Sequence, residues 1–257
     1  MAGSRKVQLR LDHTIPLNKA VSAAHAGATS LTAILLLTYS SWPIRKYQAP
    51  APAPDKQGQH SGQLDDSRNP IIYGRNQLAN ALTAWETIYL LYDTYFMINT
   101  SRKRNNLPTT LRALNFLAKE SPAVLAHHVL LASAFLLLQA YIIAGKERGL
   151  WVITALMLMN ISTPMMHARS WYRQRTGKSS NVMDVSFLVA FAGARFGTVF
   201  WVLQRYGRYH DLSAMQAYRL LRRKCQVGTL MLVTLNGAWW TVLACNVVKR
   251  HLRGRKH

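Results

Sequence analysis

The stretch that decides the fold is Pro122-Ala-Val-Leu-Ala-His127-His128-Val-Leu-Leu-Ala-Ser-Ala-Phe135-Leu-Leu-Leu138, an almost unbroken apolar run that carries two adjacent histidines. A run of this length and composition is typical of a helix that crosses a membrane. Ionisable side chains at membrane depth are costly to bury, so they tend to face a protein interior or a wet cavity. The histidine pair therefore predicts a polar pocket inside a bundle of membrane helices.

Five other stretches have comparable length and apolarity, which predicts an all-α membrane protein with six transmembrane helices. The predicted spans are residues 20–42, 78–98, 122–144, 150–166, 183–204 and 226–248. Each is close to the roughly 17–25 residues that a helix needs to cross a bilayer. The shortest of them, 150–166, is also the most polar, so its ends are the least defined.

Outside the spans, the sequence predicts a basic N-terminal segment (1–19) and a basic tail (254–257) flanking one transmembrane domain (20–253). The polar, proline-rich loop 43–77 would by itself be a flexible, partly polyproline linker. Residues 211–224 have the composition of an amphipathic helix in the membrane interface. With an even number of spans both termini share a side, and a small excess of Lys and Arg predicts that it is the inner side.

The chain is strongly basic, with 32 Lys and Arg against 10 Asp and Glu and a formal net charge of +22. Because these charges lie mainly between apolar spans, the expected partners are anionic phospholipid head groups and other membrane-protein subunits. Nucleic-acid binding is not expected. A very basic membrane protein with few acids also suits the mitochondrial inner membrane, with the endoplasmic reticulum as the alternative.

Helical spacing predicts which polar side chains share a face of a span. Glu86 and Asp93 are seven residues apart, and His128 and Gln139 are eleven apart, so each pair lies on one face. Adjacent side chains on a helix point about 100° apart, so at most one of the two histidines faces the pocket. The alternative for a membrane histidine is a simple hydrogen bond between helices.

Polar residues from four spans are predicted to converge at one depth near the side of the termini, since a helix rises about 1.5 Å per residue. They are Asp93, His127, His167 and Asp184, with Asn160 slightly deeper. Arg195 shares a face of its span with Asp184 and is expected to neutralise it, with a ligand-binding role as the alternative.

A basic rim and an apolar chamber complete the predicted pocket. The rim consists of Arg102, Lys103, Arg104, Arg169 and Arg173, and the chamber of Phe135, Phe191, Trp239 and Trp240. A basic mouth above an apolar shaft suits an amphiphile with an anionic head group. The alternatives are a solvated positive-inside face for the rim and ordinary packing for the aromatic side chains. No metal site is predicted.

Four short motifs follow one another along the chain. They are Tyr89-Leu-Leu-Tyr-Asp93-Thr-Tyr-Phe-Met97, His127-His128, Arg195-Phe196 and Leu235-Asn236-Gly-Ala-Trp239-Trp240. In this order, from about Asn80 to Arg253, the sequence resembles the TLC domain, the membrane module of ceramide synthases, the translocation-associated membrane protein and their relatives. Asn160-Ile-Ser-Thr-Pro164-Met-Met-His-Ala-Arg169 resembles the Glu-Ile-Ser-Thr-Pro…Arg signature of the TLC-domain-containing branch.

The resemblance implies a six-helix membrane barrel with a central, lipid-sized cavity. In ceramide synthases the matching histidines transfer a fatty acyl group from acyl-CoA to a sphingoid amine, which implies His127 and His128 as catalytic residues and acyl-CoA as the co-substrate. An imidazole can accept the proton of the nucleophile or take the acyl group itself. Asp93 would fix the tautomer of one ring.

Two departures from the family pattern favour a barrel that has lost this reaction. The aspartate-rich stretch that follows the histidines in the synthases is absent. Asn160 stands where the closer branch has a glutamate, and an amide can neither act as a base nor hold a charge.

The sequence leaves three functions open, because fold-level likeness alone does not choose between them. The favoured one is a pseudoenzyme without cofactor that binds lipid and serves as a structural or accessory subunit of a larger, mitochondrial membrane complex. The second is an acyl-CoA-dependent acyltransferase acting on a lipid amine or hydroxyl. The third is a sensor or regulator of membrane lipid composition.

Overall fold

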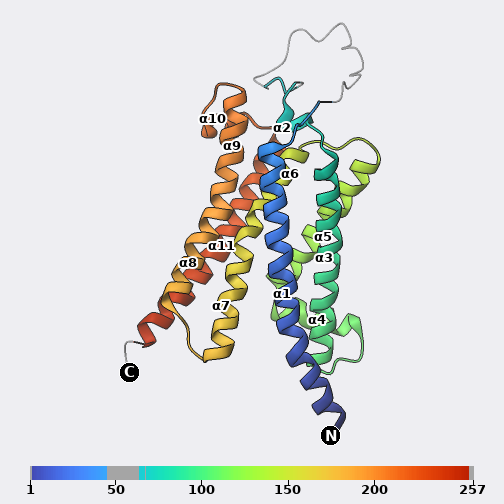
Figure 1. The fold of residues 1–257 in the computed structure, drawn as a ribbon, viewed down its shortest axis with the longest axis vertical. Coiled ribbons are helices and arrows are strands. Elements are labelled where there is room, and N and C mark those ends of the chain that lie inside the picture. Colours follow the sequence, from blue (N-terminus) through green and yellow to red (C-terminus); the bar gives the residue numbers. More distant parts are fainter. Residues whose placement is uncertain (1, 45–63, 67, 255–257) are drawn as a thin grey trace. The chain divides into compact units, whose positions relative to one another are not determined.

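The computed structural model describes residues 2–44, 64–66 and 68–254, and the side chains of this part from residue 16 to residue 250. Its regular elements are helices, and an isolated β-bridge joins Ile44 to Gly74 (Figure 1). In chain order they are α1 (Ala2–Tyr39), α2 (Pro70–Tyr73), α3 (Gln77–Arg104), α4 (Thr110–Glu120), α5 (Pro122–Ile143), α6 (Leu150–Leu156), η1 (Met157–Ser162), α7 (Thr163–Thr176), α8 (Asn181–Ala192), η2 (Gly193–Gly197), α9 (Thr198–Tyr209), α10 (Ala214–Leu220) and α11 (Arg223–Gly254). The all-α class is confirmed.

Five stretches of the described chain are long and apolar enough to cross a membrane, which confirms five of the predicted spans with shifted ends. They are Pro16–Tyr39, Pro122–Ile143, Leu150–Thr176, Asn181–Tyr209 and Arg223–Arg250. The remaining predicted span, 78–98, lies in α3, which has sufficient length at 28 residues. Because α3 carries Glu86 and Asp93 in its middle, it does not reach the same apolarity, and the six-helix count stays a prediction.

The ends of several elements differ from the sequence prediction. The segment 1–19 is helical from Ala2 and continuous with the first span, since α1 reaches Tyr39. Within the loop 43–77, Asn69 caps the short helix α2, while residues 45–63 lie outside the described part. In the stretch 211–224, only Ala214–Leu220 forms the expected helix, because α11 already begins at Arg223.

The chain divides into two compact units. Unit 1 comprises Met1–His25 and Asn80–Glu147, and unit 2 comprises Ala26–Ala79 and Arg148–His257.

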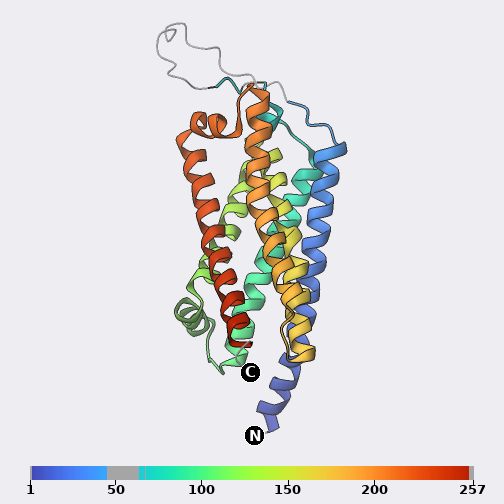
Figure 2. The same ribbon diagram turned by 90° about the vertical axis from the view of Figure 1, so that its left-hand side faces the viewer.

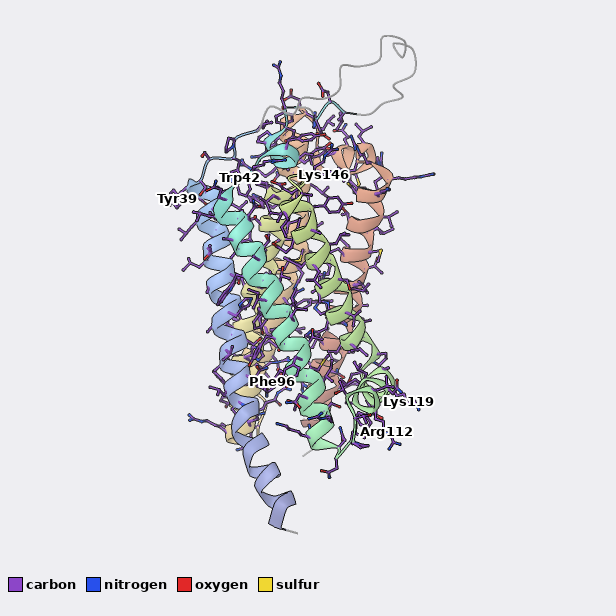
Figure 3. The ribbon with its side chains drawn as sticks, turned by 90° about the vertical axis from the view of Figure 1, so that its right-hand side faces the viewer. Tyr39, Trp42, Phe96, Arg112, Lys119 and Lys146 are labelled. Carbon is purple, nitrogen blue, oxygen red and sulfur yellow. The ribbon has the colours of Figure 1, made fainter. Side chains whose placement is uncertain are left out.

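In unit 1, α3 and α5 run side by side in opposite directions (Figure 1). Thr109 caps α4, whose buried Leu117 faces inward, because the helix has one apolar side and packs on α5. The exposed Arg112 and Lys119 lie on α4 at one end of the unit, and Lys146 lies at the other end (Figure 3).

In unit 2, two long helices are interrupted near their middles, and α11 runs alongside α8 (Figure 2). The first passes from α6 through the 3₁₀ segment η1 into α7, and the second from α8 through the π-helical segment η2 into α9. Pro164 explains the first interruption, because proline has no N–H to donate and is best accommodated in the first turn of a helix, where it stands in α7. The two interrupted segments, η1 and η2, pack against each other.

A hydrophobic cluster closes one end of unit 2, where α2, α6, α9 and α10 meet. Its buried members are Ile71, Trp151, Ala155, Val202, Tyr206 and Ala217. Gly207 allows the close approach of α10, since a Cβ atom there would lie 2.6 Å from the carbonyl oxygen of Leu212 and 3.2 Å from the Cβ of Ala217.

Candidate lipid-binding site

Polar side chains join α1 to α3 in unit 1 at two points. His25 Nε2 lies 2.9 Å from Glu86 Oε2, and Asn18 Nδ2 donates to Asp93 Oδ1 at 3.4 Å. The two contacts are seven residues apart on each helix. The residue numbers rise along α1 as they fall along α3, as antiparallel helices require. The seven-residue spacing of Glu86 and Asp93 thus places both carboxylates toward one neighbouring helix.

A second face of α3 joins α5 in the same manner. Thr94 Oγ1 lies 3.3 Å from His128 Nδ1, and Gln139 Nε2 donates to Thr83 Oγ1 at 3.0 Å. The spacing is eleven residues on each helix, again in opposite directions. One helix face therefore holds both His128 and Gln139, as the spacing predicts.

The tautomer of His128 follows from the hydrogen bonds of Thr94. The Thr94 hydroxyl donates its one proton to the carbonyl oxygen of Leu90 at 2.7 Å, so Oγ1 accepts from the ring and Nδ1 of His128 carries a proton. Nε2 faces Asp93 Oδ2 at 3.8 Å, which is too long for a hydrogen bond but within reach of an ion pair. Thr94, rather than Asp93, holds the nitrogen that fixes the tautomer.

His127 lies against the ring of His128. Its ring meets that of His128 edge to face, with centroids 5.8 Å apart and planes at 90°. Both rings are half-buried. Unit 1 thus brings together His127, His128 and Asp93, the three residues that the family resemblance implies for catalysis.

In unit 2 three arginines converge on one carboxylate. Asp184, in the first turn of α8, is 2% exposed. Its Oδ1 accepts from Arg169 Nη1 at 3.2 Å and from Arg173 Nη2 at 2.6 Å, and its Oδ2 accepts from Arg250 Nη2 at 3.0 Å. Arg169 also lies over the ring of Phe187, 4.4 Å from its centroid. We call these four charged residues the Asp184 cluster; it carries two positive charges in excess.

The expected pairing of Asp184 with Arg195 is wrong. Eleven residues along one helix separate their positions by about 16 Å, although they share a face. Arg169 and Arg173, which are one turn apart on α7, meet Asp184 from the neighbouring helix instead. Arg250, from the end of α11, was missed by sequence reasoning. The one sequence feature that could have indicated this role is the place of Arg250 directly after a long apolar run.

Arg195 lies in the π-helical segment η2 and has an amide partner. Its Nη1 donates to Asn236 Oδ1 of α11 at 3.3 Å, and its guanidinium lies 5.1 Å from the ring centroid of Phe191. Asn236 is buried and donates its own Nδ2 to the carbonyl oxygen of Leu232 at 2.7 Å. Asn160 lies in η1, the segment that packs against η2.

The other predicted pocket residues are distributed over both units. His167 is half-buried on α7, Phe135 is half-buried on α5, and Trp239 is half-buried on α11. Trp240 is 36% exposed and donates its indole N–H to the carbonyl oxygen of Leu188 at 3.1 Å, so it joins α11 to α8.

Two members of the predicted rim, Arg169 and Arg173, belong to the Asp184 cluster in unit 2. The others, Arg102, Lys103 and Arg104, form the last turn of α3 in unit 1. Unit 1 contains Asp93 and His127, whereas unit 2 contains Asn160, His167 and Asp184. Their convergence at one depth therefore stays a prediction.

Two polar anchors were not predicted. The first is the pair of His25 and Glu86, both buried. The second is Asp66, whose carboxylate accepts from Tyr206 at 3.0 Å, contacts His210 Nε2 at 3.0 Å and accepts from Asn69 at 3.0 Å. Asp66 thus joins the described end of the polar loop 43–77 to α9. Among the described residues, no three His, Cys, Asp or Glu side chains gather in a way that could hold a metal ion.

Comparison with known proteins agrees with this architecture. A family model, the TLC domain, matches residues 17–247, which is most of the chain. No curated protein and no solved structure matches it. Five membrane-length apolar helices and a family match of this extent identify the chain as an integral membrane protein that belongs to the TLC domain family.

Proposed function

We propose that this chain is a non-catalytic member of its family that binds anionic phospholipid and serves as an accessory subunit of a larger membrane complex. The observation that carries the proposal is the Asp184 cluster, in which three guanidinium groups share one carboxylate. Arginine matches phosphate oxygens with its planar fork of N–H donors. The two excess charges suit the phosphate of a lipid head group.

The accessibility of the cluster supports this assignment. The side chains of Arg173 and Arg250 are 32% and 36% exposed, whereas that of Arg169 is 12% exposed and Asp184 is buried. Each of these two arginines, Arg173 and Arg250, uses one Nη atom for Asp184. Two partly exposed arginines on a buried carboxylate therefore keep N–H donors for a ligand at the end of the apolar helices, where lipid phosphates lie.

The absence of catalysis is proposed from Asn160. Asn160 replaces the second acid of the closer family branch, so a proton relay through it is incomplete. A retained barrel of six helices around a lipid-sized cavity, without acyl transfer, is the form of the family that these residues support.

The accessory role is proposed from charge. A net charge of +22, carried largely by loops and helix ends, favours acidic protein partners as well as lipid. The mitochondrial inner membrane suits such a protein, with the endoplasmic reticulum as the alternative. Deletion should then weaken the assembly, measured by native electrophoresis of solubilised membranes. A protein that migrates alone, with no complex lost on its deletion, would favour a sensor of lipid composition.

Replacing Arg173 and Arg250 together with glutamine should reduce affinity for phosphatidylglycerol roughly tenfold or more, because each basic residue near an anionic surface contributes about 1 kcal/mol. Binding is measured by native mass spectrometry of the full chain from nanodiscs of phosphatidylcholine with and without phosphatidylglycerol. The matched control removes two exposed charges from α4, in Arg112→Gln/Lys119→Gln. Equal retention of phosphatidylglycerol by the two double variants would contradict the head-group site.

The pairing of His128 with Asp93 favours a second candidate, an acyl-CoA-dependent acyltransferase. Losing one group from a proton relay typically costs about 10²–10⁴-fold in rate, so we expect no acyl-CoA turnover above that of the His127→Ala/His128→Ala variant. The assay follows free CoA release and lipid acylation by the purified protein. Histidine-dependent acylation of a lipid amine or hydroxyl would establish the enzyme instead.

A further inference from the structure

A lone positive charge lies in the middle of a membrane helix in unit 2. Arg195 is the central residue of the 29-residue apolar stretch Asn181–Tyr209. An arginine at this depth is costly, and such residues typically pair with an acid or mark the path of a ligand. Among the described residues no carboxylate pairs with Arg195, since Asp184 is held by three other arginines. The charge of Arg195 is therefore not compensated by any acid in the described part of the chain.

The guanidinium of Arg195 has a protein partner on one side, and on the other a buried N–H group that donates to none of the described residues. Nη1 donates to Asn236 Oδ1, and one face of the group lies against Phe191. Nε is buried and donates to no described residue. Nε–H and the second Nη group point to the same side of the guanidinium, and this two-donor edge is the one that a carboxylate accepts in parallel hydrogen bonds.

The backbone around Arg195 is built irregularly. Arg195 lies in the π-helical segment η2, which packs against the 3₁₀ segment η1 of the neighbouring helix. Irregular backbone at membrane depth is tolerated where it is buried in protein or lines a cavity, and π-helical turns recur at functional sites. In η1, the carbonyl oxygen of Met157 accepts from the Ser30 hydroxyl at 3.4 Å, which compensates part of the distortion.

We propose that Arg195 binds the carboxylate of a long-chain fatty acid, with Asn236 positioning the guanidinium from α11. A free fatty acid has one chain and one carboxylate, and its extended chain is long enough to cross half of the hydrocarbon core, roughly 15 Å. A phospholipid head group, with its phosphate at the membrane surface, belongs at the Asp184 cluster instead. This inference rests on the proposed lipid-binding function, to which it adds a second site and a second class of lipid.

The test measures binding of radiolabelled palmitate to the full-length protein in detergent, with 1-hexadecanol as the uncharged analogue. Arg195→Met should weaken palmitate binding at least tenfold and leave hexadecanol binding unchanged, because only the carboxylate needs the guanidinium. The matched control is Arg205→Met, which removes an exposed arginine from the same long helix. Asn236→Asp supplies the missing carboxylate from the protein, so it should keep the fold and still weaken palmitate binding at least tenfold.

The Asn236→Asp variant also separates a binding role from a structural one. If Arg195→Met does not fold but Asn236→Asp folds and loses palmitate, the inference holds. It is overturned if Asn236→Asp, or a folded Arg195→Met, binds palmitate as the unmodified protein does. It is also overturned if hexadecanol affinity falls equally. Intact binding of phosphatidylglycerol in either case leaves the proposed function standing, so the two failures are distinguishable.

Discussion

Replacing Asp184 with alanine should lower the free energy of unfolding by about 3–5 kcal/mol, the usual effect of removing one partner from a buried ion pair. The carboxylate is 2% exposed and holds three guanidinium groups within 3.2 Å. Without it, three like charges face one another. The partial exposure of Arg173 and Arg250 places the expected value at the lower end of the range. The measurement is equilibrium unfolding in mixed micelles, followed by circular dichroism.

Two further variants test the origin of this loss. Asp184→Asn keeps the shape and an acceptor oxygen, so it should recover part of the stability. Glu120→Ala removes an exposed carboxylate at the end of α4 and should change stability by no more than about 0.5 kcal/mol. Added phosphatidylglycerol should reduce the loss in Asp184→Ala, because a lipid phosphate can replace the missing carboxylate. An alanine variant as stable as Glu120→Ala would contradict the central role of Asp184.

The spans were predictable from sequence, but their ends were not. A run of apolar residues reports contact with lipid, whereas a helix ends where its backbone hydrogen bonds end. The fourth span illustrates the difference, because its apolar part ends near residue 166 while the helix continues to Thr176. Gly177, with φ 65°, ends it in the left-handed conformation that favours glycine. The polar, basic last part of that helix lies outside the span predicted from the sequence.

Spacing predicted the faces of helices correctly but not the partners across them. Residues seven or eleven apart share a helix face, which is why Glu86 with Asp93 and His128 with Gln139 each face one neighbour. The partner on the next helix depends on register and packing, which one helix does not encode. The expected Asp184–Arg195 pair is wrong for this reason, as Arg195 instead meets Asn236.

One missed anchor did leave a trace in the sequence. Asn18 and His25 are seven residues apart in the first span, as Glu86 and Asp93 are in the second. Matching intervals of polar residues in two consecutive spans are what antiparallel neighbours need in order to pair twice. The pairing seen between α1 and α3 follows this rule. The Asp66 anchor left no such trace, since two of its three partners lie far along the chain, Tyr206 on α9 and His210 in the turn that follows it.

Replacing His25 with leucine should destabilise the protein by about 3–5 kcal/mol, the usual effect of removing one partner from a buried pair that includes a charge. His25 and Glu86 are both buried, 2.9 Å apart. A polar contact between membrane helices contributes much less, on average about 0.6 kcal/mol. The buried carboxylate of Glu86, whose desolvation the imidazole helps to offset, therefore determines the size of the effect more than the lost hydrogen bond does.

A second substitution tests this origin in equilibrium unfolding. The double variant His25→Leu/Glu86→Leu should return to within about 1 kcal/mol of the unmodified protein, since an apolar pair often replaces a buried ion pair without loss. The difference that remains is the stacking of the His25 ring on Tyr89, at 3.6 Å between centroids. A loss that persists undiminished in the double variant would show that the stacked rings, and not the pair of His25 and Glu86, join α1 to α3.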